Sequence, residues 1–348
     1  MSDQKLIEVE NLKVYFPIHG KGLFRREIGA VKAVDGLSFY INKGETLGLV
    51  GESGSGKTTV GRALLRALDV TEGQVTFYLD DGQTVDVTAL KGKDLRNFRR
   101  YMQLIFQDPR SSLNPRMTVR DIIAEPLVAN KLVKGKAVDE KVRETAALCK
   151  LNLEHLRRFP HAFSGGQRQR VGIARALVSN PKFIVCDESV SALDVSIQAE
   201  ILNLLMELQE ELGVTYLFIA HDLSVVAHIS DRVAVMYVGQ LVELAATEEL
   251  FFSPKHPYTE ALLSAIPEVD PDLAMKPVIL RGEIPNPANP PPGCRFHTRC
   301  PYVEDICKTD QPVWQEIEPE HFVACHFADT LQLKGVVADA AAENGRNT

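Results

Sequence analysis

The sequence predicts an α/β protein whose chemistry lies at the ends of buried parallel strands. Three short apolar runs, 46–50, 183–187 and 216–220, have the length and composition of strands that are buried on both faces. The first run leads into a glycine-rich loop, the second ends in two carboxylates, and a histidine follows the third. Ligands of open α/β sheets bind beyond the carboxyl ends of the strands, so we expect the functional residues there.

The first strand is followed by a phosphate-binding loop. Residues 51–58 match G-x-x-x-x-G-K-[ST] at every fixed position, and a helical pattern follows from Val60 to Leu68. The glycines let backbone N–H groups point inward at an anion, and the helix N-terminus adds its dipole. We expect Lys57 to reach the β- and γ-phosphates and the Thr58 hydroxyl to bind Mg²⁺. The expected nucleotide-binding residues of this segment are Gly51, Glu52, Ser53, Gly54, Ser55, Gly56, Lys57, Thr58 and Thr59.

The second strand supplies the acidic groups of a metal site. Residues 183–187 are apolar up to Asp187, and Glu188 follows directly. We expect Asp187 to hold Mg²⁺, directly or through water, and Glu188 to polarise the water that attacks the γ-phosphate. A helix start with solvated acids would leave the preceding apolar run unexplained.

Between these two strands, from about residue 108 to 180, the pattern becomes helical and contains a second anion site. Ser164 is a natural N-cap residue, and Gly165 and Gly166 permit close backbone approach. Apolar residues then recur at helical spacing, at Val171, Ala174, Leu177 and Val178. Because the chain already has its own phosphate loop, the simplest use of this helix is a nucleotide bound to another subunit.

These features together resemble the ATP-binding subunits of ABC transporters, and within them the dipeptide and oligopeptide importers, over roughly residues 5 to 327. The segment 163–170, FSGGQRQR, is similar to the signature motif of that family, with Phe163 in place of the commoner leucine. The resemblance implies a P-loop NTPase core with an antiparallel β subdomain, an inserted α-helical subdomain and a small C-terminal extension. It also implies that two ATPase subunits enclose two ATP molecules, with the partner's ATP contacted by Ser164, Gly165, Gly166 and Gln167.

The resemblance assigns further roles to residues that are weak indicators alone. Gln107 is similar to the loop glutamine that senses Mg²⁺ and the attacking water, and His221 to the switch histidine at the γ-phosphate. Phe16 resembles the aromatic residue that stacks on adenine. The implied catalytic residues are Glu188, His221 and Gln107, the Mg²⁺ residues are Thr58, Gln107 and Asp187, and the loop that communicates across the dimer is Ser191, Ala192, Leu193 and Asp194. One departure is Ser189, where the family usually has proline.

Composition and charge narrow the class of protein. The chain has 348 residues, of which 45% are hydrophobic and 24% charged, which is typical of globular proteins. No run approaches 18 apolar residues, and the amino terminus lacks the layout of a signal peptide, so we expect the chain on the cytoplasmic face of the cell membrane, held there by protein partners. A formal net charge of −7 argues against general nucleic-acid binding.

The chain is expected to contain three regions. Residues 1–265 form the ATPase domain, with a helical subdomain at about 108–180 and a surface hairpin around Asp80–Gly82. Residues 266–330 form the extension, which begins with an extended, proline-rich strap at 284–293. Residues 331–348 are expected to be a disordered tail.

Four of the six cysteines, Cys294, Cys300, Cys307 and Cys325, fall in the extension, whereas Cys149 and Cys186 are expected to be buried packing residues. Their spacing does not identify a metal. The resemblance favours a [4Fe-4S] cluster, because similar importer ATPases carry a comparable four-cysteine extension. Zinc remains an alternative, with three histidines nearby as possible ligands, and free thiols are a third. These histidines are His297, His321 and His326.

The function implied is that of an ATPase subunit that energises import of di- or oligopeptides. The implied partners are a second homologous ATPase, two membrane permeases and an extracytoplasmic binding protein. Import of an oligosaccharide or nickel is open, because the solute is recognised by other proteins. An ABC-type ATPase of DNA repair or translation would predict a coiled-coil insertion, tandem cassettes or a basic surface, and a P-loop kinase would leave FSGGQ and His221 without a role.

Overall fold

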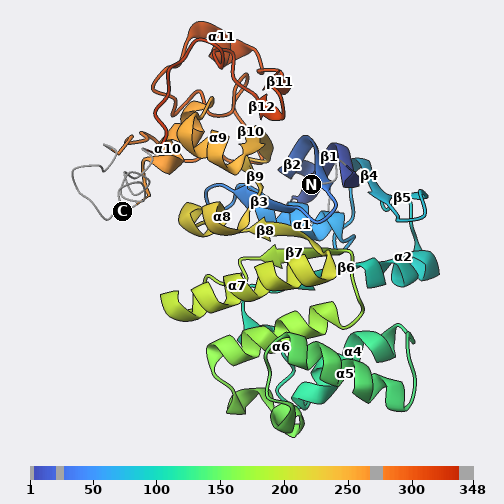
Figure 1. Cartoon of the computed structure of the whole chain (residues 1–348). Helices are drawn as coiled ribbons and strands as arrows, with labels where there is room; N and C mark the ends of the chain where they lie inside the picture. The colour runs from blue at the N-terminus through green and yellow to red at the C-terminus, as the bar shows by residue number, and fades with distance from the viewer. Residues whose placement is uncertain (1–3, 21–26, 267–276, 337–348) are drawn as a thin grey trace, which may run out of the picture. The chain divides into compact units, whose positions relative to one another are not determined.

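The computed structural model describes residues 4–20, 27–266 and 277–336 (Figure 1). These residues belong to two units. Unit 1 consists of 1–14, 35–48 and 57–220, and unit 2 of 15–34, 49–56 and 221–348. The units interleave along the sequence, so they do not coincide with the domains 1–265 and 266–330, and that boundary stays a prediction.

An antiparallel sheet forms near the N-terminus, and most of its residues belong to unit 1. Its strands are β1 (Lys5–His19), β2 (Glu27–Asn42), β4 (Glu72–Tyr78) and β5 (Thr84–Asp86), in the order β2-β1-β4-β5. In β1, Ile7 pairs with Phe77 and Val9 with Val75, and all four side chains are buried. The turn between β4 and β5 lies at the predicted hairpin, where Gly82 has a φ of +80°. The expected antiparallel β subdomain is therefore confirmed.

The parallel strands of unit 1 are β6 (Met102–Ile105), β7 (Phe183–Asp187) and β8 (Thr215–Ile219). All residues of β7 and β8 are buried, which explains their unbroken apolar sequences. Strand β3 (Thr46–Val50) begins in unit 1, where the Tyr216 N–H donates to the carbonyl of Glu45 at 2.9 Å. The predicted strands at 46–50, 183–187 and 216–220 are confirmed to within one residue.

Helix α1 (Lys57–Leu64) packs on these strands at a glycine. A Cβ atom on Gly61 would lie 2.7 Å from Cγ1 of Val185 and 3.0 Å from Cδ1 of Ile219. Contacts that short force neighbouring atoms to shift, so the helix approaches β7 and β8 as closely as it does only because position 61 has no side chain.

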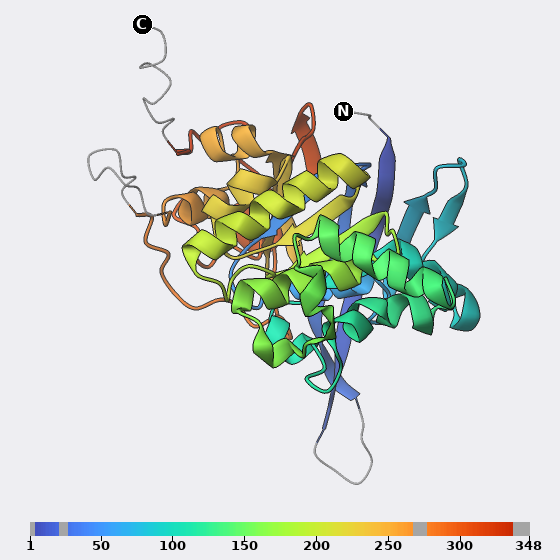
Figure 2. The same ribbon diagram turned by 60° about the horizontal axis from the view of Figure 1, so that its bottom comes forward.

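The inserted helices of unit 1 lie side by side in Figures 1 and 2, with α4 (Val119–Ala129) and α5 (Lys136–Leu148) both against α6 (Gly165–Leu177). The Thr118 hydroxyl caps α4 by accepting from the Asp121 N–H, and the buried face of α4 includes Val119, Ile122 and Ile123. The remaining helices of this unit are α2 (Gly92–Phe98), η1 (Arg99–Tyr101), α3 (Pro109–Ser112), α4 (Val119–Ala129), α5 (Lys136–Leu148), η2 (Leu153–Arg157), η3 (Pro160–Ala162), α6 (Gly165–Leu177) and α7 (Val195–Leu212).

Unit 2 is built on an antiparallel sheet with strand order β11-β12-β10-β9. Glu243 of β10 pairs with Val235 of β9 on one side and with Val323 of β12 on the other. The sequence predicted only an extended strap in this extension, whereas the chain also forms a strand hairpin that joins the sheet. The elements are α8 (Leu223–Ile229), β9 (Arg232–Tyr237), β10 (Gln240–Ala246), α9 (Thr247–Phe252), α10 (Pro257–Leu263), α11 (Asp305–Thr309), β11 (Gln315–Glu318) and β12 (His321–Val323).

An aromatic cluster packs the start of the extension against β9 and α10. The ring centroid of Phe296 lies 5.2 Å from that of Tyr237 and 5.4 Å from that of Tyr258, and all three side chains are buried. Each such pair contributes about 0.5–1.5 kcal/mol beyond the burial of its area. Phe296 thus ties the start of the extension to β9 and α10.

The end of the described chain is also held in place. The Lys334 N–H donates to Oε1 of Glu260 at 2.9 Å, and the Val336 N–H to the carbonyl of Phe251 at 2.8 Å. The disordered tail predicted at 331–348 stays a prediction, since 337–348 lie outside the described residues. Within the described ranges, no helix combines the length and apolar character needed to span a membrane.

Two glycine substitutions test the packing of unit 1. Gly61→Ala should destabilise the protein by about 1–3 kcal/mol, because its Cβ meets Val185 and Ile219. Gly172→Ala lies in the interior of α6, where the added Cβ meets no atom within 4 Å apart from its chain neighbours and the backbone of its own helix, so it should instead stabilise the protein by about 1 kcal/mol. Urea unfolding of the full chain measures both. Equal effects of the two substitutions would contradict the close packing of α1.

Candidate active site

The end of β7 is linked to the start of α1 by a side-chain hydrogen bond. The Thr58 hydroxyl donates to Oδ1 of Asp187 at 2.8 Å, and Nη2 of Arg62 lies 3.8 Å from Oδ2. Asp187 is only 4% exposed. A buried carboxylate needs such partners, because it has lost the water that would solvate it. Two of the three residues predicted to hold Mg²⁺, Thr58 and Asp187, are therefore in direct contact.

The second acid, Glu188, is held beside the predicted glutamine. Nε2 of Gln107, in the loop after β6, donates to Oε2 of Glu188 at 2.5 Å. The backbone of Glu188 has a φ of +47°, which costs about 1–2 kcal/mol for a residue with a Cβ. Strained conformations of this kind concentrate at functional sites. The structure thus brings together residues that are 81 positions apart in the sequence.

The loop predicted to communicate across a dimer, Ser191 to Asp194, is hydrogen-bonded to Glu188 through its first residue. The hydroxyl of Ser191 donates to the Glu188 carbonyl at 2.9 Å, and the Ser191 N–H does so at 3.2 Å. Asp194 ends this loop and caps α7 by accepting from the Ile197 N–H at 3.0 Å. Ser189, the next residue, is buried at 1% exposure.

The predicted signature segment forms a capped helix start. The Ser164 hydroxyl accepts from the Gln167 N–H at 3.3 Å, and Oε1 of Gln167 accepts from the Ser164 N–H at 3.0 Å. This reciprocal capping box confirms the predicted N-cap and adds a use for the Gln167 side chain that the sequence argument missed. A Cβ on Gly166 would lie 2.5 Å from Cγ2 of Ile197, so this glycine also lets α6 approach α7.

Unit 2 contains residues 51–56 of the phosphate loop. Gly51 and Gly56 have φ values of +146° and +109°. A Cβ at either position would lie 2.1 Å from a carbonyl oxygen, that of Met236 for Gly51 and that of Ala33 for Gly56. The Glu52 N–H donates to the Tyr258 hydroxyl at 2.8 Å. The glycines are therefore required by close backbone packing as well as by the anion site.

Other predicted site residues lie in the same unit or on α1. Phe16 on β1 is 40% exposed, which leaves its ring accessible, and His221 is exposed immediately after β8. Lys57 is buried, and Thr59 is half-buried in the first turn of α1. Phe16, residues 51–56 and His221 belong to unit 2, whereas Lys57, Thr58, Gln107, Asp187 and Glu188 belong to unit 1.

A contact that sequence reasoning missed links the extension to the phosphate loop within unit 2. Nη1 and Nη2 of Arg299 bind the two carboxylate oxygens of Glu52 at 2.7 and 3.1 Å. The Arg299 side chain is 8% exposed and that of Glu52 is 26% exposed, so the arginine end of this bidentate pair is the buried one. The two residues are 247 positions apart, and no sequence pattern marks either as the partner of the other.

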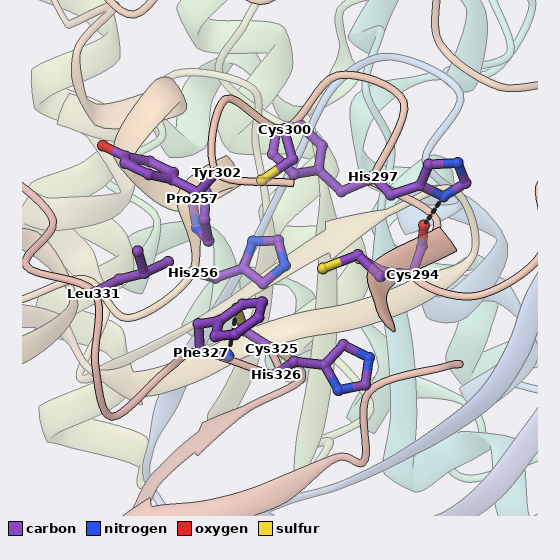
Figure 3. Close-up of a pocket in the computed structure, with 12 residues that line it drawn as sticks. His256, Pro257, Cys294, His297, Cys300, Tyr302, Cys325, His326, Phe327 and Leu331 are labelled. Atoms are coloured by element: carbon purple, nitrogen blue, oxygen red, sulfur yellow. Dashed lines mark hydrogen bonds between the residues drawn. The ribbon is translucent and has the colours of Figure 1, made fainter. Parts of the chain in front are cut away.

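The four cysteines of the extension line one small cavity (Figure 3). The sulphur atoms of Cys294 and Cys300 face the ring of His256, and Cys325 lies behind Phe327. The cavity has a volume of about 20 Å³, which is room for about one water molecule. Cys149 and Cys186, by contrast, are fully buried away from it, as predicted.

The sulphur atoms are not gathered into a single-ion site. Two thiolates that bind one zinc at about 2.3 Å cannot be more than about 4.6 Å apart. In the described part of the chain, no three ligand atoms from these cysteines and their neighbouring histidines lie within 4.8 Å of one another. Burial raises the pKa of the Cys294 thiol, and raises that of Cys325 to about 11. The zinc alternative does not fit this arrangement.

The three histidines named as possible zinc ligands have other partners. Nδ1 of His297 lies 2.8 Å from the Cys294 carbonyl, and Nε2 of His326 lies 2.9 Å from the carbonyl of Asp310. His321 does not line the cavity, and its Nε2 contacts Glu243 at 2.9 Å. The expectation that His321 could substitute for a cysteine at this site is therefore wrong, because the β11-β12 hairpin carries it to β10.

Comparison with protein families gives two matches. Residues 34–191 match the family described as ABC transporter, and residues 242–307 match the oligopeptide/dipeptide transporter, C-terminal region. The chain is 53% identical over 329 residues to the oligopeptide transport ATP-binding protein AppF of Bacillus subtilis (strain 168), covering 94% of this chain and 98% of the relative. It is 50% identical over 325 residues to a putative peptide import ATP-binding protein of Brucella ovis, covering 93% and 98%.

Solved structures show the same fold. A dimeric ATP-binding cassette in a post-hydrolysis state, bound to ADP and Pi, aligns with a TM-score of 0.59 and 27% identity, over 70% of this chain and 99% of the other. The protein cbiO1 of Clostridium perfringens, part of an ABC transporter complex, aligns with a TM-score of 0.60 and 26% identity, over 72% and 91%. The predicted fold class is confirmed.

The contact between Arg299 and Glu52 gives a test of the phosphate loop. Arg299→Ala should weaken ATP binding by about tenfold or more. The carboxylate of Glu52 would lose its cationic partner, and its uncompensated negative charge would repel the phosphates. Lys308→Ala, which removes an exposed pair with Asp305 in the same extension, is the control and should bind ATP normally. Isothermal titration with ATP measures both, and unchanged affinity of the Arg299 variant would refute a role for this contact.

Proposed function

This chain belongs to the ATP-binding subunits of ABC transporters, in the oligopeptide and dipeptide group, and from that premise we propose that it hydrolyses ATP to energise peptide import. The relatives at about half identity are named for oligopeptide transport or peptide import, and they align over nearly the whole chain. These names favour a peptide over an oligosaccharide or nickel as the transported solute. The net charge of −7 argues against the other candidate, an ABC-type ATPase that acts on nucleic acid, because such a protein needs a basic surface.

The observation that carries the proposal is the pair of hydrogen bonds at the strand ends. Thr58 with Asp187 and Gln107 with Glu188 provide two neighbouring sets of oxygen atoms on unit 1. Hydroxyl, carboxylate and amide oxygens are ligands that Mg²⁺ prefers, so Thr58, Asp187 and Gln107 fit the metal that accompanies ATP. When bound, Mg²⁺ would neutralise the negative charge that develops on the phosphates.

The residues of the chain then divide the work of hydrolysis. Glu188 polarises the attacking water. Gln107, which is hydrogen-bonded to Glu188, orients that water. Lys57 and the N–H groups of residues 51–56 bind the phosphates, and His221 contacts the γ-phosphate. Phe16, whose ring is exposed, stacks on adenine.

We assign the capped N-terminus of α6 to the nucleotide of a second subunit. Ser164, Gly165 and Gly166 open a helix of 13 residues, and such a helix start stabilises an anion. The phosphate loop at 51–58 supplies the chain's own site, so the second site serves a partner. The implied assembly has a second homologous ATPase, two permeases and a substrate-binding protein, with this chain on the cytoplasmic face of the membrane.

For the extension we propose a [4Fe-4S] cluster held by Cys294, Cys300, Cys307 and Cys325. Support comes from four thiols that line a single cavity, and from a donor set that suits iron–sulfur chemistry. A cavity with room for about one water is too small, so cluster binding requires the loops that carry the cysteines to move apart. The hydrolytic mechanism uses none of these residues.

Glu188→Gln tests the hydrolytic role. The amide keeps the shape and the contact with Gln107 but loses the negative charge, so ATP should still bind while turnover in the assembled transporter falls by about 100-fold or more. Glu207→Gln, an exposed glutamate of α7 that pairs with Lys150, is the matched control and should turn over normally. Phosphate release is the readout, and comparable rates for the two variants would remove Glu188 from catalysis.

The cluster proposal is tested by metal analysis of anaerobically purified chain. About four irons per chain and a brown colour are expected, as the formula of the cluster requires. Cys300→Ser should lose the iron, whereas Cys149→Ala, at a buried site in unit 1, should keep it. Stoichiometric zinc without iron, or no metal, would show that the extension does not hold a cluster, and would leave the ATPase proposal untouched.

A further inference from the structure

His321, at the start of β12, is held by a buried carboxylate. Its Nε2 lies 2.9 Å from Oε1 of Glu243 on β10, and both side chains are almost fully buried. Glu243 also accepts the Lys255 N–H at 2.7 Å and the His256 N–H at 3.0 Å. Because Glu243 accepts the other two of these bonds, we assign Nε2 of His321 as the ring nitrogen that donates to it. The orientation and tautomer of the ring are therefore fixed.

The other ring nitrogen has no partner. Nδ1 of His321 is buried and makes no hydrogen bond within the described residues. In the neutral ring, with the proton on Nε2, this atom carries a lone pair. Leaving a buried polar atom unsatisfied costs about 1–3 kcal/mol, so its position calls for a ligand.

Two exposed carboxylates approach the same histidine. One ligand atom from each of Glu249, Glu318 and His321 lies within 4.8 Å of the others. Glu249 is in α9, and Glu318 ends β11 directly opposite His321 in the hairpin register (Figure 1). Nε2 is already occupied by Glu243, so Nδ1 is the ring nitrogen that is left to share a ligand with Glu249 and Glu318.

We propose that Nδ1 of His321 and the carboxylates of Glu249 and Glu318 bind a divalent transition-metal ion of the zinc class. Imidazole nitrogen with carboxylate oxygen is a donor set that zinc accepts, and three protein ligands leave a fourth position for water. Metal-binding histidines almost always donate their other N–H to a carboxylate or carbonyl, which is the arrangement of Nε2 and Glu243. The ion would cross-link the β11-β12 hairpin to α9.

The charges around this group define an alternative. Nζ of Lys255 lies 3.1 Å from Oε1 of Glu318 and competes with a cation for that carboxylate. The ion pair between Lys255 and Glu318 would then satisfy that carboxylate without a metal. Lys255→Gln distinguishes the two, because it should tighten zinc binding several-fold if Glu318 is a ligand.

Zinc bound per full-length chain, measured by equilibrium dialysis against buffered zinc, tests the site. The extension cysteines contribute equally to every sample, so the comparison is between variants. Glu249→Gln should bind one zinc fewer than wild type, or bind it at least about tenfold more weakly. Glu248→Gln, the neighbouring exposed glutamate of the same helix, is the matched control and should behave as wild type.

His321→Gln should lose the same single zinc. Since that side chain is buried, the exposed Glu249 variant decides the matter if the histidine variant fails to fold. A shift of the His321 ring ¹⁵N resonances on addition of zinc to wild type, absent in Glu249→Gln, gives a second readout. Equal zinc binding by wild type and Glu249→Gln would overturn the site, as would unchanged or weaker binding by Lys255→Gln.

Discussion

The candidate active site depends on a strand that has no exposed face. Every residue of β7 is buried, so a carboxylate within it would lose its hydration without compensation. The sequence becomes acidic only where the strand ends, and there Asp187 is stabilised by the Thr58 hydroxyl and by Arg62. Glu188 follows in a left-handed conformation, with Gln107 donating to its side chain and Ser191 to its carbonyl. Packing of the core thus sets the positions of the groups proposed for catalysis.

In unit 2 the extension contacts the phosphate loop and the residues that pack against it. Phe296 packs on Tyr237 and Tyr258, and the Tyr258 hydroxyl accepts from the Glu52 N–H while Arg299 binds the Glu52 carboxylate. Arg299 is the neighbour in sequence of Cys300, which lines the cysteine cavity. A substitution in the extension can therefore affect the phosphate loop through the ion pair of Arg299 with Glu52, or through the hydrogen bond of the Tyr258 hydroxyl with the Glu52 N–H. The proposed metal site at His321 would fix another part of the same extension.

Local patterns in the sequence predicted the features that depend on local physics. The phosphate loop, the strand at 183–187 and the Ser164 N-cap follow from spacing and residue type, and the structure has the loop's glycine conformations, the strand and the cap. Features that depend on long-range pairing were missed: the contact between Arg299 and Glu52, the β11-β12 hairpin in a polar segment, and the removal of His321 from the cysteines. Cysteine spacing likewise could not show that the four sulphurs share a cavity without forming a single-ion site.

Peptide uptake by the reconstituted transporter tests the central claim most directly. The complete complex, placed in proteoliposomes with ATP and Mg²⁺ on the side of this chain, is supplied with binding protein and a labelled tripeptide, and uptake and phosphate release are measured in one sample. Both should rise together with ATP concentration, and a non-hydrolysable analogue should support neither sustained process. Sustained uptake with the analogue, or hydrolysis without any peptide entering, would contradict the account.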